Sequence, residues 1–192
     1  MVQERMEAVR GVQTDLSDRN TSASRRRRLD ERFYLHFPAV FRLVTGAWMR
    51  FPPTSRLRRL MLAQFFRAGY AAGNRRDFPV LRLGMDPDFE YRPAPEMLVP
   101  DHQPVFYGHE GYERLWRHWL DAFEAIRLEP KDALDLGHEV LVTAHVSVHG
   151  TRSGMSLSQP LFQLYHLRRG FVIRQDDFTD RAQALEAVGV RE

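Results

Sequence analysis

Apolar side chains recur at helical spacing through the first half of the chain. A first helix is predicted from Pro38, which can occupy the first turn because its missing N–H is not needed there, to the stop at Pro52. A second is predicted from Ser55, a suitable N-cap, to Gly73, a suitable C-terminal stop. The two apolar stripes are Val40, Phe41, Val44, Ala47, Trp48 and Phe51, and Leu57, Leu60, Met61, Phe65, Ala68 and Ala72.

The clearest amphipathic pattern covers residues 108–127. Its polar side chains share one face of the predicted helix, and its opposite face is continuously apolar. A helix of this kind must lie across other apolar surface. The apolar face consists of Tyr112, Leu115, Trp116, Trp119, Leu120, Phe123 and Ile126.

The period then changes from 3.6 to 2, which is typical of strands. Four strands are predicted, at residues 128–136, 139–149, 155–168 and 171–178, separated by short glycine-containing turns. Short connections between successive strands favour antiparallel hairpins. Asp180 is a suitable N-cap for a last helix over residues 181–188.

Between the two halves the pattern predicts a short helix at residues 77–84 and a short strand at 88–92. A proline-rich loop follows at residues 93–107, long enough to be a candidate functional loop. The order of elements indicates an α+β fold, in which helices cover one face of a curved antiparallel sheet.

Composition narrows the functional classes. The chain has 192 residues and no cysteine, which excludes disulfide scaffolds, thiolate zinc sites and a cysteine nucleophile. The histidines show no metal-ligand spacing with carboxylates, so no metal is expected. The net charge of +3 is uneven, because residues 1–64 hold 13 arginines against 6 acidic residues.

The N-terminal part is expected to differ from the rest. Residues 1–28 are predicted to be a disordered basic tail, ending in four arginines at 25–28. The apolar stretch at 33–51 contains Arg42 and Arg50, which favours a buried or interfacial helix over a membrane-spanning one. Weak membrane association through this segment is expected, with no specific nucleic acid partner. No secretory signal is apparent, so a cytoplasmic location is expected.

Residues 65–189 resemble the SnoaL-like branch of the nuclear transport factor two-like superfamily. Four stretches carry the resemblance in order: GNRRDF at 73–78, DPDFEYR at 86–92, YGHEGYERLWRHW at 107–119 and RRGFVIRQDDFTDRAQALEAVG at 168–189. It implies a cone-shaped, curved antiparallel or mixed sheet wrapped around helices (a cystatin-like α+β barrel) with a deep pocket. We therefore divide the chain into the tail, an N-terminal helical appendage at 29–56 and a SnoaL-like domain at 57–192. The family also implies a homodimer.

Strand alternation leaves two assignments of the pocket face. In one, the polar row of strand 139–149, which holds His145 and Ser147, looks inward, and its valines form an outer face that a dimer partner or the N-terminal helices would cover. In the other, the valines are buried and Asp177 is exposed together with the histidine. A polar interior row suits a ligand site, so we favour the first.

The resemblance adds candidate roles. The Arg-x-Asp pair of limonene epoxide hydrolase falls on His145 and Ser147, and its last aspartate falls on Asp177; only Asp177 is retained, so epoxide hydrolysis is not expected. The predicted catalytic residues are Asp177 and His145. The predicted substrate-binding residues are Tyr91, Trp116, Trp119, Ser147, Gln159, Gln163, Tyr165 and Gln175.

These residues suit cofactor-free acid–base chemistry on a small apolar carbonyl compound. A carboxylate in an apolar cavity has a raised pKa and can act as a general base, with His145 orienting it and a tyrosine donating to a developing oxyanion. An isomerase, cyclase or lyase would use these steps. One alternative is a non-catalytic small-molecule binder with the same pocket, and another is an interaction module whose N-terminal basic helix docks on a membrane or a partner. Asp177 has a structural alternative as well, a cap or an ion pair with Arg174 or Arg181, and the tryptophans have one as core residues.

Overall fold

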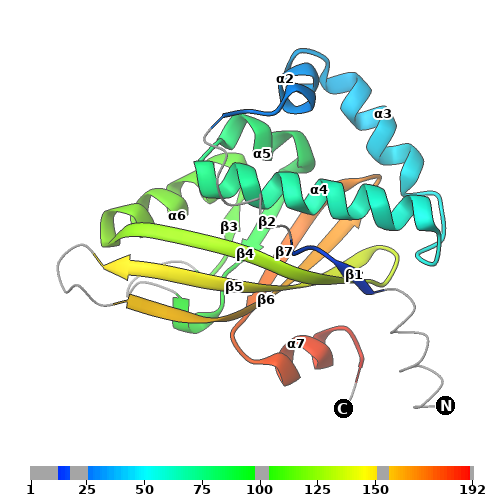
Figure 1. Cartoon of the computed structure of the whole chain (residues 1–192). Coiled ribbons are helices and arrows are strands. Elements are labelled where there is room, and N and C mark those ends of the chain that lie inside the picture. Colours follow the sequence, from blue (N-terminus) through cyan, green and yellow to red (C-terminus); the bar gives the residue numbers. More distant parts are fainter. Residues whose placement is uncertain (1–12, 18–25, 98–103, 151–155, 191–192) are drawn as a thin grey trace.

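A computed structural model describes residues 13–17, 26–97, 104–150 and 156–190. It confirms the α+β class, with six helices and a seven-stranded mixed sheet in these residues (Figure 1). The helices are α2 (Leu29–His36), α3 (Pro38–Trp48), α4 (Arg56–Arg75), α5 (Phe78–Gly84), α6 (Gly108–Ala122) and α7 (Arg181–Ala187), with a 3-10 turn η1 (Pro95–Met97). The strands are β1 (Gln13–Asp15), β2 (Met85–Arg92), β3 (Phe106–Tyr107), β4 (Phe123–Asp135), β5 (Glu139–Gly150), β6 (Ser156–Arg168) and β7 (Phe171–Phe178).

The sheet order is β1-β4-β5-β6-β7-β2-β3. The long strands β4 to β7 form an antiparallel meander, as their short turns predict, whereas β2 joins β7 in parallel. Helices α4, α5 and α6 lie on one face of the curved sheet, and α2 and α3 lie beyond α4 (Figure 1). The short helix α7 covers part of the opposite face.

The main core lies between the sheet and the helices above it. Its buried residues include Leu62 and Phe66 of α4 and Leu115 of α6, which meet Val140 and Val142 of β5. A smaller cluster on the other face joins α7 to β5 and β6. Asp180 caps α7 as predicted, because its side chain accepts a hydrogen bond from the backbone N–H of Gln183.

Two sequence predictions are corrected by strand pairing. The predicted disordered tail includes Gln13–Asp15, which pairs with the edge of β4 and is followed by the fully buried Leu16; residues 1–12 and 18–25 lie outside the described part. The long helix ends at Ala122 and not at residue 127, because Phe123 already has extended dihedral angles and opens β4. Cross-strand pairing with β5 therefore overrides the helical spacing of the last apolar residues.

The N-terminal helices rest on the β6–β7 turn. Gly170 in this turn has φ +82, and a Cβ built on it would come within 2.7 Å of backbone and side-chain atoms of Thr45 in α3. Position 170 therefore needs glycine for two reasons: the backbone there is left-handed, and a side chain would collide with Thr45. Within the described residues, no helix is long and apolar enough to cross a membrane.

We expect Gly170→Ala to destabilise the protein by more than about 2 kcal/mol. A left-handed backbone costs a residue with a Cβ about 1–2 kcal/mol, and the displacement of Thr45 adds to this cost. Gly137→Ala is the matched control, because Gly137 also has positive φ but has no atom within 4 Å of an added Cβ. Urea unfolding of both variants measures the difference, and equal losses would show that the contact with α3 contributes nothing.

Candidate functional site

A cavity of about 190 Å³ lies between the helices and the sheet. Its wall is mostly apolar and comes from five helices on one side and the sheet on the other. Helices α2 and α3, predicted as a separate appendage, supply part of it through Tyr34, Phe41, Val44 and Trp48. The polar side chains that the sheet contributes are Gln163, Tyr165 and Gln175.

Asp177 is buried next to these glutamines. Its Oδ1 accepts hydrogen bonds from the amides of Gln175 (2.8 Å) and Gln163 (3.0 Å), and its Oδ2 accepts one from the hydroxyl of Tyr91 (2.5 Å). All three donors are neutral, and Asp177 itself does not line the cavity. The two glutamines, which do line it, connect the carboxylate to the cavity.

The strand register brings these residues together. Gln163 of β6 lies opposite Asp177 of β7, and Tyr165 lies opposite Gln175. On the other side of β7, Tyr91 of the parallel strand β2 also pairs with Gln175. Side chains of paired residues share a face of the sheet, so alternation along three strands places all five on the helix-covered side.

Burial raises the pKa of Asp177 to about 6, although hydrogen bonds from Gln175, Tyr91 and Gln163 stabilise the charged form and oppose the shift. Burial also raises the pKa of the Tyr91 and Tyr165 phenols well above the usual value, so both remain protonated donors. At neutral pH the site therefore holds an ionised carboxylate that accepts a proton readily, surrounded by neutral donors.

Two tyrosines, Tyr70 and Tyr165, fix the amide of Gln163. The hydroxyl of Tyr70, on α4, donates to Gln163 Oε1 at 2.5 Å. The hydroxyl of Tyr165 lies 3.3 Å from both the Tyr70 hydroxyl and Gln163 Oε1, and its proton is shared between these two acceptors. Because the amide oxygen accepts from the tyrosines, its NH₂ group is directed at Asp177. This network joins α4 to three strands and leaves the hydroxyls of Tyr70 and Tyr165 beside the cavity.

The predicted orientation of β5 is wrong. His145 and Ser147 lie on the sheet face opposite the cavity, where both interact with the hydroxyl of Ser158, at 2.7 and 3.2 Å. The register explains the error, because Val142 lies opposite Gln163 and therefore shares its inward face. His145 and Asp177 are on opposite faces, so the predicted catalytic pair is not formed. The argument for a dimer from an outward valine row also loses its basis.

The other predicted binding residues divide into two groups. Trp116 lines the cavity and packs edge-on against Tyr112, whose hydroxyl lies beside its buried indole N–H. Trp119 packs against Tyr91 and donates to the backbone oxygen of Met97 at 3.3 Å, outside the cavity lining. Gln159 lies further along β6, opposite Val146, and does not reach the cavity.

Sequence reasoning missed Tyr70 and the inner faces of α2 and α3. The spacing of Tyr70, four residues after Phe66 and on the buried stripe of α4, was a usable signal for an inward position. By contrast, the local sequence gives no signal for the hydrogen bond between Tyr70 and Gln163, which lie 93 positions apart. Among the described residues, no group of three His, Asp or Glu side chains is placed to hold a metal ion.

A model of the SnoaL-like domain matches residues 66–175, which is more than half of the chain. The chain belongs to the SnoaL-like family. The match begins inside α4 and ends in β7, so it contains Tyr70, Tyr91, Gln163 and Gln175 and stops two residues before Asp177. A comparison with curated proteins gives no match.

Solved structures of similar fold support this placement of the SnoaL-like protein. TerC, crystallised with polyporic acid, is 23% identical, with a TM-score of 0.56 over 66% of this chain and 96% of TerC. An NTF2-like protein of unknown function from Burkholderia pseudomallei is 21% identical, with a TM-score of 0.56 over 66% and 94% of the two chains. IdmH, a putative polyketide cyclase from Streptomyces antibioticus, is 18% identical, with a TM-score of 0.53 over 67% and 98%. At these identities the likeness shows the fold.

Proposed function

We propose that this SnoaL-like protein binds one small apolar molecule that carries a hydrogen-bond acceptor such as a carbonyl oxygen. The observation that supports it most is the cavity of about 190 Å³, whose wall is mostly apolar and whose polar groups are few and convergent. Trp116, Tyr165 and Gln175 of that wall carry hydrogen-bond donors, which suit an acceptor on the ligand.

Narrowing the cavity at Gly69 is expected to abolish ligand binding. Gly69 of α4 lines the cavity, and a Cβ built there meets no atom within 4 Å, so a larger side chain enters open space. Ligands are first identified by mass spectrometry of compounds that co-purify with the protein, and by thermal shift against a panel of apolar ketones and quinones. Gly69→Leu should lose the shift.

Gly69→Ala is the matched control, because it makes the same change in backbone freedom with little loss of volume. It should keep the ligand-induced shift. Trp116→Phe should weaken binding of carbonyl ligands and leave binding of the corresponding hydrocarbons unchanged. If Gly69→Leu binds the identified ligand as tightly as wild type, the ligand occupies another place and the proposal is wrong.

A catalytic role is favoured by one further observation, the position of Asp177 behind the cavity wall with a pKa of about 6. In this candidate function Asp177 removes a proton from a carbon next to the ligand's carbonyl, and the resulting enolate oxygen accepts a hydrogen bond from the cavity wall. For the proton to reach Oδ1, the amide of Gln175 or Gln163 must give up its place there. Turnover by Asp177→Asn, compared with Asp176→Asn, tests this role.

A further inference from the structure

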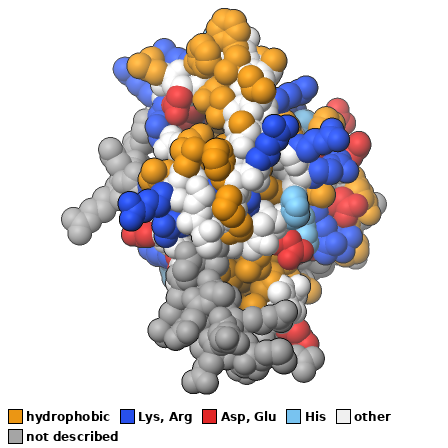
Figure 2. Space-filling model, turned by 90° about the vertical axis from the view of Figure 1, so that its right-hand side faces the viewer, with side chains coloured by type: hydrophobic (Ala, Val, Ile, Leu, Met, Phe, Trp, Pro, Cys, Tyr) orange, Lys and Arg blue, Asp and Glu red, His pale blue; other side chains and the backbone are white. Residues whose placement is uncertain are grey.

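The N-terminal helices expose an apolar outer surface. We call it the outer apolar surface and define it by Leu29, Phe33 and Phe37 near α2, Val40 and Leu43 of α3, Phe51 after α3, and Leu57 and Leu60 of α4. Leu29 is 83% exposed, Leu43 73% and Leu60 69%. Figure 2 shows hydrophobic side chains gathered over the part of the molecule that α3 and the start of α4 present. Large apolar side chains grouped in this way mark an interaction site.

The charge of this region has one sign. No acidic residue occurs between Glu31 and Asp77, whereas nine arginines do. Arg32 of α2, Arg50 after α3 and Arg56 of α4 are exposed next to the outer apolar surface, whereas Arg42 of α3 lies over the ring of Phe171. Figure 2 shows blue side chains beside the orange ones. The surface therefore combines apolar side chains with cationic ones.

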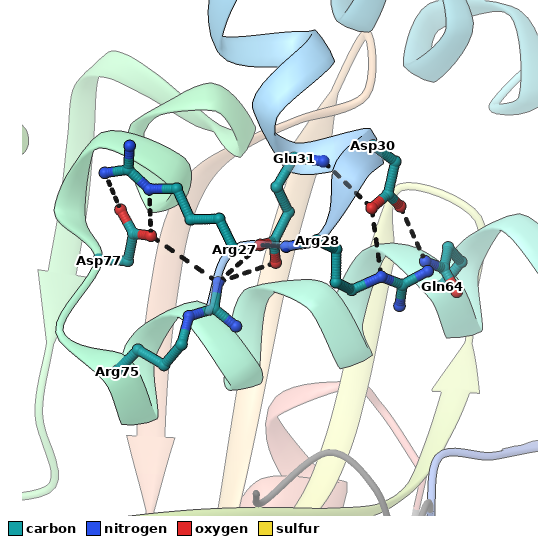
Figure 3. Close-up of polar contacts among 7 residues, drawn as sticks. All are labelled: Arg27, Arg28, Asp30, Glu31, Gln64, Arg75 and Asp77. Atoms are coloured by element: carbon teal, nitrogen blue, oxygen red, sulfur yellow. Dashed lines mark hydrogen bonds and ion pairs between the residues drawn. The ribbon is translucent and has the colours of Figure 1, made fainter. Parts of the chain in front are cut away.

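Glu31 and Asp77, the acids at the two ends of this arginine-containing segment, point inward and are paired with arginines (Figure 3). Glu31 is 4% exposed, and both of its carboxylate oxygens accept from the guanidinium of Arg75, at 2.8 and 2.9 Å. Asp77 accepts two hydrogen bonds from Arg27, at 2.7 and 2.9 Å. These ion pairs attach the start of α2 to the end of α4. The remaining acid of α2, Asp30, is partly exposed and pairs with Arg28 at 3.2 Å.

We infer that the outer apolar surface docks on the surface of an anionic phospholipid bilayer. Leucine and phenylalanine side chains would enter the boundary between headgroups and acyl chains, and the exposed arginines would contact lipid phosphates, as interfacial helices with an apolar and a cationic side do. Since no described helix is able to span a bilayer, the helices would lie in its surface plane.

Charge favours a bilayer over a second copy of the chain. A symmetric dimer places the same surface patch of each subunit against the other. Here that would bring Arg32 and Arg50 of two subunits together. The acids of α2 are not available to pair with them, because Asp30 and Glu31 already contact arginines of their own subunit. An anionic lipid surface neutralises these charges, and each arginine near it raises the binding constant by about fivefold.

The same helices that carry the outer apolar surface line the cavity on their inner side, through Tyr34, Val44 and Trp48. A protein docked in this way would hold its cavity one helix layer from the bilayer, where apolar compounds concentrate. This consequence rests on the proposed function; the docking itself does not, because it is measured with lipid alone.

The test is vesicle flotation of the full chain without added ligand. Binding to vesicles of phosphatidylcholine with 30 mol% phosphatidylglycerol is expected to exceed binding to pure phosphatidylcholine by at least about tenfold, and to fall with salt, in line with a bilayer potential that is screened within a Debye length. Leu29→Ser with Phe33→Ser and Leu43→Ser should reduce it by at least about a hundredfold. Arg32→Glu with Arg50→Glu should reduce it by at least about thirtyfold.

Two controls separate docking from loss of folding or of net charge. Arg114→Glu with Arg117→Glu makes the same charge change at exposed positions of α6 and should keep vesicle binding, as should Leu157→Ser at an exposed position of β6. Thermal unfolding checks that each variant is folded. Equal binding to neutral vesicles, equal loss in the α6 variant, or a dimer in light scattering that the triple serine variant dissociates would each overturn the proposal.

Discussion

Replacing Asp135 by asparagine is expected to destabilise the protein by about 3–5 kcal/mol, the usual cost of leaving a buried charge without its partner. Asp135 is 1% exposed and accepts two hydrogen bonds from Arg58, at 2.7 and 2.8 Å. Arg58, itself buried, also donates to the backbone oxygens of Met49, Phe51 and Gly137. One guanidinium therefore joins α4, the beginning of the α3–α4 connection and the β4–β5 turn.

The asparagine keeps the shape of Asp135 but not its charge, so the guanidinium remains in place among neutral carbonyls. For a chain of this size the loss corresponds to a fall in Tm of roughly 6–20 °C. Glu129→Gln is the control, because its pair with Arg127 is exposed and should contribute less than about 1 kcal/mol. Thermal and urea unfolding give both values.

Replacing Arg58 and Asp135 together shows whether Asp135→Asn destabilises the protein by leaving a charge unpaired or by disturbing the packing. Arg58→Met together with Asp135→Leu removes both charges and should be more stable than Asp135→Asn alone, because no unpaired charge is left. If Asp135→Asn unfolds no earlier than Glu129→Gln, the ion pair does not hold the N-terminal helices to the sheet.

Alternation predicted the polar faces of β6 and β7 correctly but not that of β5. On β7 the two faces are chemically distinct, since Asp177 is enclosed by neutral donors and Asp176 contacts His166 and Arg174. On β5 both rows are partly buried: the valines face the helices, and Leu141 packs beneath α7. Periodicity fixes which residues share a face, whereas only the register with β6 decides which face is inward.

The cavity shows a second limit of sequence reasoning. Its floor was predicted, because Gln163, Tyr165 and Gln175 follow from strand alternation together with the family resemblance. Its cover was not, because the contact of Tyr34 or Trp48 with the sheet side of the cavity depends on tertiary packing of α2 and α3. Ion pairs such as Glu31–Arg75, 44 positions apart, hold these helices and leave no local pattern in the chain.

The stability of the Asp177→Asn variant relative to wild type is expected to rise with pH. The folded-state pKa of Asp177 is raised to about 6 from a usual value of 3.8. Below about pH 3 both the folded and the unfolded chain hold this proton. Between about pH 3 and pH 6 the unfolded chain releases it first, so wild-type stability falls as pH rises, by roughly 3 kcal/mol in total.

Asp177→Asn has no such titration, so its free energy of unfolding minus that of wild type should rise by roughly 2.5 kcal/mol between pH 4 and pH 7. Urea unfolding at several pH values measures this without any ligand. If Asp177 is also the base, the same variant should lower turnover of an identified substrate by about 10²–10⁴-fold. If Asp177→Asn gains stability as pH rises and also loses activity, the buried charge of Asp177 is retained for catalysis at the expense of stability.

Asp176→Asn separates this effect from general loss of charge on β7. Although burial opposes it, hydrogen bonds from His166 and Arg174 hold the pKa of Asp176 below its usual value. Its titration therefore lies below pH 4. With the neighbouring imidazole removed from both proteins by His166→Gln, the difference made by Asp176→Asn should stay flat from pH 4 to pH 7. A flat difference for Asp177→Asn as well would mean that its carboxylate is solvated in the folded protein, and neither the raised pKa nor a role as base would then hold.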